Sequence, residues 1–403
     1  MTRNICVRRL LLFMVAMLAL TGCQWNPAAG PAGQPSPLPS AGSGPTVTPT
    51  DTPHPTPTPT PAPTPTPVVT RATLAAIGDV LLHNTVYQDA MTEQGGYDFK
   101  PMFALVRDRL RQSDLVVANQ ESITGGTELG LSSYPLFNSP HEIGDALLDS
   151  GIDLVTMANN HAMDMREKGI VSAIAYWNQL GMPYTGAFAS KEDRDRIRVL
   201  KTHDISFAFL SYTYGTNGIP VPADKPYLVN LIDEPRIQAD IERARELGDV
   251  VVVSMHWGIE DQANPNDTQR TLAEKLAAWG ADIVIGSHPH VLQPFAWLTR
   301  PDGKRTFVMY SLGNFLSAQD MMPELIGGIG QIEVVKTIKG GTVTIEMTSP
   351  TFMPTYNKYV NYRHYQIVPF SQLSKADAER VMPVWESFRS NLVAGMPELQ
   401  IEE

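Results

Sequence analysis

Residues 280–290 place two histidines directly after a short apolar run, and this stretch constrains the fold more than any other part of the chain. Residues 283–285 are Ile, Val and Ile, a composition typical of a strand that is buried on both faces. Gly286 ends the run, and His288 and His290 follow at spacing i, i+2. In extended backbone, two such side chains point to the same side. Open α/β sheets bind their ligands at the carboxyl ends of strands, so we expect a ligand site here.

The same arrangement occurs at four other places, where polar side chains follow a strand-like apolar run. They are Asp79 after residues 71–77, Asn119 and Glu121 after residues 114–118, Asn160 and His161 after residues 152–157, and His256 after residues 250–254. Chance burial would not select strand ends alone, so we expect these loops to meet at one pocket. Carboxylate, imidazole and amide groups suit a divalent ion such as Mn, Zn or Fe.

Strand-like and helix-like segments alternate through residues 68–372, which predicts an α/β layered domain. Two expected hairpins make its sheets mixed rather than purely parallel, and they join residues 198–201 to 205–212 and residues 332–338 to 343–347. The expected helices are residues 97–112, 140–151, 168–180, 234–247, 267–279 and 374–392. The last helix belongs to a C-terminal segment of residues 373–403, with Ser374 as its N-cap.

Composition narrows the classes of ligand and partner. The chain has 403 residues, of which 43% are hydrophobic, enough for a substantial core. Its net charge of −11 argues against nucleic acid as a partner. Both cysteines, Cys6 and Cys23, precede the expected globular part, so a metal there has no thiolate ligand.

The amino-terminal residues predict export and attachment to a membrane. A basic start, a short apolar run and a Leu-Thr-Gly-Cys ending give residues 1–23 the layout of a secretory signal. The ending resembles a bacterial lipobox, in which Cys23 is lipidated; an uncleaved anchor helix is the alternative. Residues 24–67 are rich in Pro and Thr, which predicts a disordered, extended stalk. We therefore expect a lipid-anchored protein at the extracellular face of the cell membrane.

Six blocks of this sequence resemble the bacterial CapA family of capsule synthesis proteins. In chain order they are Gly-Asp at 78–79, Asn-Gln-Glu at 119–121, Asn-Asn-His-Ala-Met-Asp at 159–164, His-Trp-Gly-Ile-Glu at 256–260, Gly-Ser-His-Pro-His at 286–290 and Tyr-Ser-Leu-Gly-Asn-Phe at 310–315. The resemblance implies a calcineurin-like metallophosphoesterase fold, which is a four-layer α/β/β/α sandwich with mixed sheets. It also implies a part in making a capsule polymer such as poly-γ-glutamate.

The resemblance assigns a role to each ligand-type residue. Asp79 matches the first aspartate of the metallophosphoesterase pattern, and Glu121 stands where that pattern has a metal-bridging carboxylate. The other implied metal ligands are Asn160, His256, His288 and His290. The implied chemistry is metal-assisted hydrolysis, with Asp79 and His161 as catalytic residues and His161 protonating the leaving oxygen.

This sequence departs from the resembled pattern at one position. The pattern usually has a histidine two residues after the first aspartate, and this chain has Leu81 there. His83 is the candidate replacement. We therefore expect the site to bind either one metal ion or two.

The expected substrate contacts are Trp257, Glu260 and Asn314. The expected partners are an anionic polymer such as poly-γ-glutamate, the membrane through the lipid anchor, and membrane synthase subunits. Two other functions stay open, namely a non-catalytic polymer-binding or assembly subunit of a synthase complex and a secreted metal-dependent phosphoesterase.

Several of these residues also have simpler structural explanations. Asp79 can cap a helix, and Glu121 can pair with an arginine. Trp257 can serve in packing, and Asn314 can serve in a turn. Asp164 is expected to orient the Asn-His loop or to cap the helix that follows it.

Overall fold

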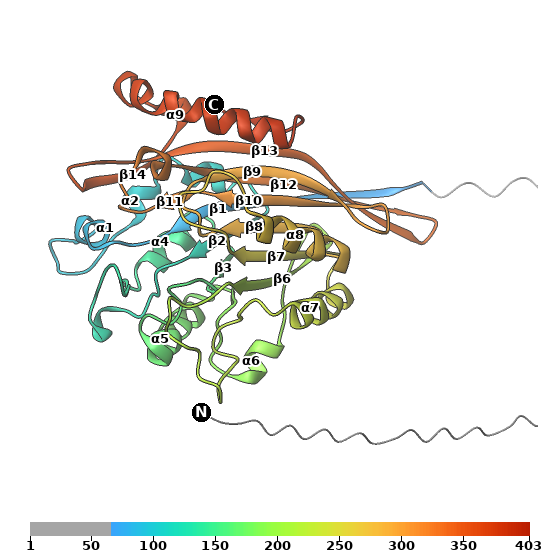
Figure 1. Ribbon diagram of the computed structural model, residues 1–403, viewed down its shortest axis with the longest axis horizontal. Helices are drawn as coiled ribbons and strands as arrows, with labels where there is room; N and C mark the ends of the chain where they lie inside the picture. The colour runs from blue at the N-terminus through green and yellow to red at the C-terminus, as the bar shows by residue number, and fades with distance from the viewer. Residues whose placement is uncertain (1–65) are drawn as a thin grey trace, which may run out of the picture. The chain divides into compact units, whose positions relative to one another are not determined.

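The computed structural model describes residues 66–403, in which two mixed β-sheets face each other and helices cover their outer sides (Figure 1). The predicted four-layer α/β/β/α sandwich is therefore confirmed. The expected signal, the lipidated Cys23 and nearly all of the stalk lie outside the described residues. Among the helices of residues 66–403, none combines the length and the apolar character that crossing a membrane requires.

The two sheets differ in size. The first has nine strands, ordered β14 (Arg363–Pro369), β13 (Thr342–Val360), β12 (Ile326–Lys339), β1 (Val68–Val80), β2 (Leu115–Gln120), β3 (Leu154–Thr156) and β4 (Tyr184–Thr185), with β11 (Asn314–Leu316) beside β1 and β15 (Gln400–Ile401) beside β13. The second has six, ordered β5 (Arg198–Thr202), β6 (Ile205–Thr213), β7 (Val250–His256), β8 (Ile283–Ser287), β10 (Arg305–Leu312) and β9 (Leu292–Thr299). Both expected hairpins, β5–β6 and β12–β13, are present and antiparallel.

Helices pack on the outer face of each sheet. The first sheet is covered by α1 (Asn84–Asp89), α2 (Lys100–Phe103), α3 (Arg107–Leu110), α4 (Ile143–Asp149) and α5 (Arg166–Leu180). The second is covered by α7 (Glu234–Leu247) and α8 (Asp267–Trp279). The short α6 (Lys191–Asp195) precedes β5, and α9 (Lys375–Gly395) packs against β9. The Ser374 side chain accepts a hydrogen bond from the Asp377 N–H, which confirms it as the N-cap of α9.

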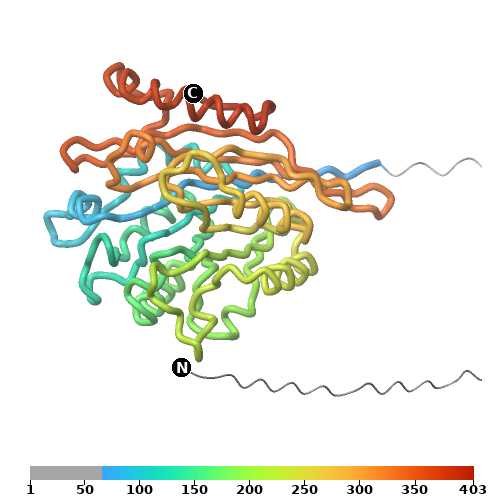
Figure 2. The backbone as a smooth tube through the Cα atoms, viewed as in Figure 1, coloured from blue at the N-terminus to red at the C-terminus, as the bar shows by residue number. Residues whose placement is uncertain are grey.

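Central strands are buried on both faces because each sheet lies between two apolar layers. In β7, Val250 and Val252 point into the core between the sheets, while Val251 and Val253 point toward α7 and α8. Alternate side chains of a strand face opposite sides, so a continuous run of valines satisfies both layers. Figure 2 shows the blue first strand running beside the orange β12, which is far away in sequence.

The single helix predicted for residues 97–112 is wrong. The structure has two short helices there, α2 and α3, separated by a turn at residues 104–106. Pro101 lacks an N–H and sits in the first turn, so α2 begins only at Lys100. The Val106 N–H then bonds to the Phe103 carbonyl, a tighter i to i+3 turn that interrupts the α-helical ladder.

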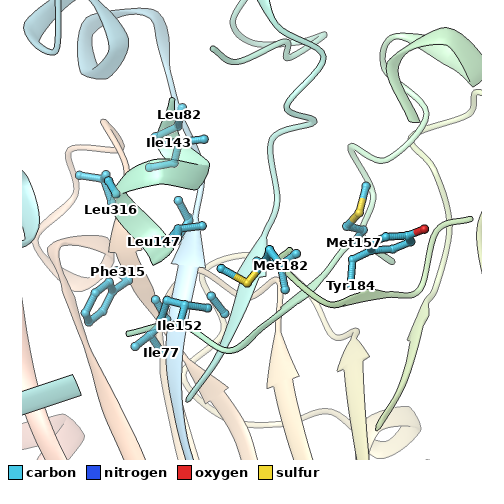
Figure 3. Close-up of a cluster of buried hydrophobic side chains, with 14 of the residues drawn as sticks. Ile77, Leu82, Ile143, Leu147, Ile152, Met157, Met182, Tyr184, Phe315 and Leu316 are labelled. Atoms are coloured by element: carbon cyan, nitrogen blue, oxygen red, sulfur yellow. The ribbon is translucent and has the colours of Figure 1, made fainter. Parts of the chain in front are cut away.

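The core under the first sheet brings together side chains from several predicted elements (Figure 3). Ile77 of β1 and Leu147 of α4 are both buried in it, as are Phe315 and Leu316 of β11. Leu147 is 0% exposed, whereas its neighbour Leu148 on the same helix is 45% exposed. The helix therefore presents one leucine to the core and one to solvent.

We expect Leu147→Ala to lower the free energy of unfolding by about 2 to 5 kcal/mol, because it removes buried methyl groups and leaves a cavity. Leu148→Ala is the matched control, and we expect it to change stability by less than about 0.5 kcal/mol. Urea denaturation of both variants measures the difference. Equal losses would contradict the packing described for α4.

Candidate metal centre

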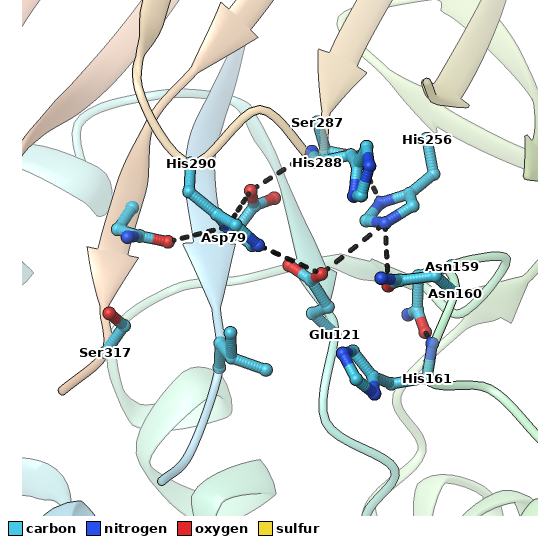
Figure 4. A network of polar contacts seen from close by, with 12 residues as sticks. Asp79, Glu121, Asn159, Asn160, His161, His256, Ser287, His288, His290 and Ser317 are labelled. Atoms are coloured by element: carbon cyan, nitrogen blue, oxygen red, sulfur yellow. Dashed lines mark hydrogen bonds and ion pairs between the residues drawn. The ribbon is translucent and has the colours of Figure 1, made fainter. Parts of the chain in front are cut away.

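The predicted ligand residues gather where the carboxyl ends of strands from both sheets meet (Figure 4). Asp79 lies near the end of β1, Glu121 directly follows β2, and His256 is the last residue of β7. The loop after β3 supplies Asn160 and His161, and the loop after β8 supplies His288 and His290. The expected convergence of distant loops is thus what the fold produces.

Two overlapping groups of three residues have ligand atoms close enough to hold a metal ion. One is Glu121, His288 and His290, and the other is Asp79, Glu121 and His256. Within each group the candidate ligand atoms lie within 4.8 Å of one another, and every residue is buried. Glu121 belongs to both groups. The centre is therefore compatible with a divalent ion.

Among the residues of the centre, Glu121 gives the strongest indication of a cation site. It is 0% exposed, and neither carboxylate oxygen has a hydrogen-bond partner. Its Oε1 lies 3.4 Å from His256 Nε2 and 3.6 Å from His290 Nε2. Its ion-pair neighbours in residues 66–403 are these histidines rather than an arginine. An unpaired buried carboxylate is costly, and a bound cation removes that cost.

Nδ1 of His288 is also buried without a hydrogen-bond partner. Metal-binding histidines use a neutral imidazole. Burial lowers the pKa of His288 to about 3, with neighbouring imidazoles adding to the effect. Burial and the adjacent histidines also hold the pKa of His256 well below its ordinary value. Both rings are therefore neutral at physiological pH and available as ligands.

Glu121 and His290 both have raised pKa values in the absence of a cation. Burial raises the pKa of Glu121 well above its ordinary value, and the charge of Asp79 adds to the rise although His290 opposes it. Burial alone would lower the pKa of His290, but the charges of Glu121 and Asp79 outweigh it and raise that pKa to about 10. Raised pKa values favour the protonated forms of both groups, so a cation that binds here must displace protons.

Asp79 is held in place by three neighbours. Its Oδ1 accepts a hydrogen bond from Asn119 Nδ2 at 2.8 Å, and its Oδ2 accepts one from the His288 backbone N–H at 3.2 Å. His290 Nδ1 lies 3.3 Å from Oδ2. The helix-cap alternative for Asp79 is wrong, because the residue lies inside β1 and the N-cap of α1 is His83.

The backbone conformation of His288 and His290 differs from the predicted one. They do not continue an extended strand: φ is +97° at His288 and +58° at His290, so both are left-handed. Such conformations cost about 1 to 3 kcal/mol each in residues other than glycine and cluster at functional sites. Gly286 is required just before them, because a Cβ there would meet the Tyr310 carbonyl oxygen at 1.9 Å.

His161 is oriented by the loop that carries it. Its Nδ1 donates a hydrogen bond to Asp164 Oδ2 at 2.7 Å, and its backbone N–H donates to Asn159 Oδ1 at 3.1 Å. The orienting role expected for Asp164 matches this geometry. Phe137, which sequence reasoning did not single out, packs edge-on against the ring at 4.6 Å. These contacts leave His161 Nε2 free for a ligand.

Asn160 and Ser287 fix the His256 ring from both sides. The Asn160 Oδ1 atom lies 3.0 Å from His256 Nε2, and the Ser287 hydroxyl lies 2.9 Å from Nδ1. Ser287 was not predicted as a site residue. Sequence reasoning could have found it, because Ser287 is the last residue of β8 and the other site residues were predicted at or just after strand ends.

The three expected substrate contacts differ in position. Trp257 is buried and donates its indole N–H to the Tyr310 carbonyl at 3.1 Å, which agrees with the packing alternative. Asn314 is fully buried, and its Oδ1 lies 3.1 Å from His290 Nδ1, so it contacts the centre itself. Glu260 is exposed, and its charge contributes to the raised pKa of Glu121.

The position at which the resembled pattern has a histidine is occupied in this chain by an apolar residue. Leu81 is buried, and its backbone N–H bonds to the Leu316 carbonyl at 2.9 Å. The His83 Nδ1 atom accepts the Ala318 N–H at 3.2 Å, and its ring packs against Phe137. His83 belongs to neither metal-compatible group among the described residues.

Fold and site together define an α/β sandwich protein with a buried, metal-compatible cluster of histidines and carboxylates. The chain belongs to the family described as bacterial capsule synthesis protein PGA_cap, whose model matches residues 73–319, more than half of the chain.

Two curated relatives carry related names. The PGA biosynthesis protein CapA of Bacillus subtilis (strain 168) is 31% identical over 256 residues, which are 60% of this chain and 62% of that protein. The capsule biosynthesis protein CapA of Bacillus anthracis is 27% identical over 258 residues, 62% of this chain and 60% of that protein. The chain thus spans less than two thirds of the length of these relatives.

A solved structure of a proposed 5'-nucleotidase from Staphylococcus aureus, in complex with alpha-ketoglutarate, matches with a TM-score of 0.40 and 14% identity. The match covers 78% of this chain and 58% of that chain. That score is too low to support an argument about fold or function.

Adding Mn²⁺ to the full chain is expected to raise the midpoint of thermal unfolding, because a ligand that binds only the folded state stabilises it. Glu121→Gln removes the charge common to both groups and should abolish the rise. His203→Ala is the control, since His203 is exposed and its Nε2 pairs with Asp114 at 2.7 Å. A full Mn²⁺-dependent rise in Glu121→Gln would show that Glu121 is not a ligand.

Affinity for Mn²⁺ is expected to increase with pH around neutrality, because binding displaces protons that the raised pKa values of Glu121 and His290 keep on these groups. The sign follows from the bound state holding fewer protons than the free state. His256 and His288 are already neutral in this range and add nothing to the slope. Calorimetric titration in buffers of different ionisation enthalpy counts the protons released, and a count of zero would contradict this prediction.

Proposed function

We propose that this protein takes part in the synthesis or export of an anionic capsule polymer such as poly-γ-glutamate, through a metal-dependent hydrolase-like site. Family membership supports the capsule role. The observation that carries the hydrolase-like site is the buried Glu121 carboxylate, which lacks a hydrogen-bond partner between two histidines. One or two divalent ions, Mn, Zn or Fe, are the proposed cofactors.

The proposed ligands divide between the two overlapping groups. Glu121, His288 and His290 would hold one ion, and Asp79, Glu121 and His256 would hold a second where two are bound. A divalent ion supplies Lewis-acid chemistry, which polarises a substrate oxygen and makes water a nucleophile near neutral pH. Asn160 acts beside them by holding the His256 ring.

The chain's own acid–base group is His161. Asp164 fixes its ring through Nδ1, so Nε2 is the atom that can deliver a proton to a leaving oxygen. Asp79 contributes by aligning His290 and the loop that carries His288.

We also propose that the domain works outside the cell, tethered through a lipidated Cys23 and the stalk of residues 24–67. Support for this comes from the signal-like residues 1–23 and from the Pro/Thr-rich composition that follows them. Membrane synthase subunits are the proposed protein partners.

A non-catalytic subunit that binds the growing polymer is the second candidate. The buried Leu81 favours it, because the resembled hydrolase pattern has a histidine at that place. The same departure weakens the case for a secreted phosphoesterase unconnected with capsule.

The test is hydrolysis by the full chain loaded with Mn²⁺, using γ-glutamyl chains and a generic phosphoester as separate substrates. We expect His288→Ala and Asp79→Asn each to reduce turnover by about a hundredfold or more, because each removes a group that prepares the centre. His203→Ala should match the wild type.

The alternatives give different results in the same assay. Bound metal with γ-glutamyl binding but no turnover supports the binding subunit. Turnover of the phosphoester alone supports the phosphoesterase. A wild-type chain that binds no divalent metal would overturn the proposed site.

A further inference from the structure

Tyr214 lies where the metal centre meets solvent. It directly follows β6, and its backbone N–H donates to the His256 carbonyl at 3.0 Å. Its ring is 4.7 Å from the His288 ring and nearly parallel to the His256 ring at 6.3 Å. Tyr214 is 48% exposed, whereas His256 is 1% and His288 is 4% exposed. A ligand arriving from solvent on this side therefore meets Tyr214 before it meets either imidazole.

Tyr214 also lines a neighbouring cavity of about 590 Å³, together with Trp257 and residues at the start of α8. Its ring thus forms a wall common to this cavity and to the centre. Glu234 and Asp267 on the cavity wall are acidic. An anionic ligand would therefore place its charged oxygen at the centre, beside Tyr214, and the rest of its body in the cavity.

The surroundings of the centre are poor in positive charge. The charged groups that act most on Glu121 are His290 and the carboxylates of Asp79, Glu260 and Asp164. These carboxylates repel an anion, so holding one requires a cation and neutral hydrogen-bond donors. A tyrosine is such a donor, because its phenol is protonated at neutral pH.

We propose that Tyr214 is a substrate-positioning residue, which donates its hydroxyl hydrogen bond to an anionic carboxylate or phosphate oxygen held at the metal centre. This rests on the proposed function, because the cation draws the oxygen to the site. The aromatic ring covers His288 and His256, while the hydroxyl selects and orients the ligand.

Tyr214→Phe separates these two contributions, since it keeps the ring and removes only the hydroxyl. We expect the Mn²⁺-loaded full chain carrying this change to bind its ligand about tenfold more weakly, the loss of one hydrogen bond to a charged group. Its Mn²⁺ content should equal that of the wild type. Tyr362→Phe is the matched control, because Tyr362 is 41% exposed and its hydroxyl bonds to Asp320 outside the centre.

The probes are a short γ-glutamyl oligomer and inorganic phosphate, each titrated by calorimetry. If Tyr214→Phe weakens binding of the oligomer alone, the hydroxyl contacts a carboxylate oxygen of the ligand. If it weakens binding of phosphate alone, the hydroxyl contacts a phosphoryl oxygen.

Unchanged affinity for both probes in Tyr214→Phe overturns the proposal and leaves the proposed function standing. Loss of Mn²⁺ from Tyr214→Phe also overturns it, because the residue would then act through the metal. A wild-type chain that binds Mn²⁺ but neither probe overturns the positioning role, and one that binds no Mn²⁺ overturns the proposed function as well.

Discussion

A carboxyl group without a hydrogen-bond partner, buried where the strand ends of the two sheets meet, is the constraint on which this structure depends. Glu121 is fully enclosed, and the nearest groups able to neutralise it are imidazoles more than 3 Å away. Each neighbour of Glu121 is in turn held by hydrogen bonds: Asn160 and Ser287 fix His256, and Asn314 fixes His290. These hydrogen bonds position the histidines around the carboxyl group. The arrangement is therefore compatible with a bound divalent ion.

Much of this arrangement follows from sequence because strand ends are easy to recognise. Runs of Ile and Val buried on both faces mark the central strands, and the polar residues directly after them must lie at one edge. This argument brings Asp79, Glu121, His161, His256 and the histidine pair together without knowledge of how the sheets pack. The two expected hairpins also predicted the mixed sheets, and the second has a clear turn signal at Gly340 and Gly341.

Sequence reasoning missed features that depend on local backbone geometry or on the exact residue at which a strand or helix ends. The left-handed φ values of His288 and His290 come from the tertiary position of their loop, and no periodicity signals them. Tyr214 escaped notice because β6 runs to Thr213, one residue beyond the predicted strand, so the aromatic residue that follows did not look like part of the strand-end set. The break between α2 and α3 has the same origin, because the apolar spacing fits one helix whereas a tight turn at residues 104–106 interrupts it.

The first strand has a mechanical consequence for a tethered protein. Its amino end at Val68 directly follows the proposed stalk, and its carboxyl end carries Asp79. Between them β1 pairs with antiparallel β12 on one side and parallel β2 on the other. A pull on the stalk along the strand axis would load both ladders in shear, so that many hydrogen bonds resist together. Under the proposed tether, tension would then be absorbed by the middle of the sheet before it could displace the aspartate.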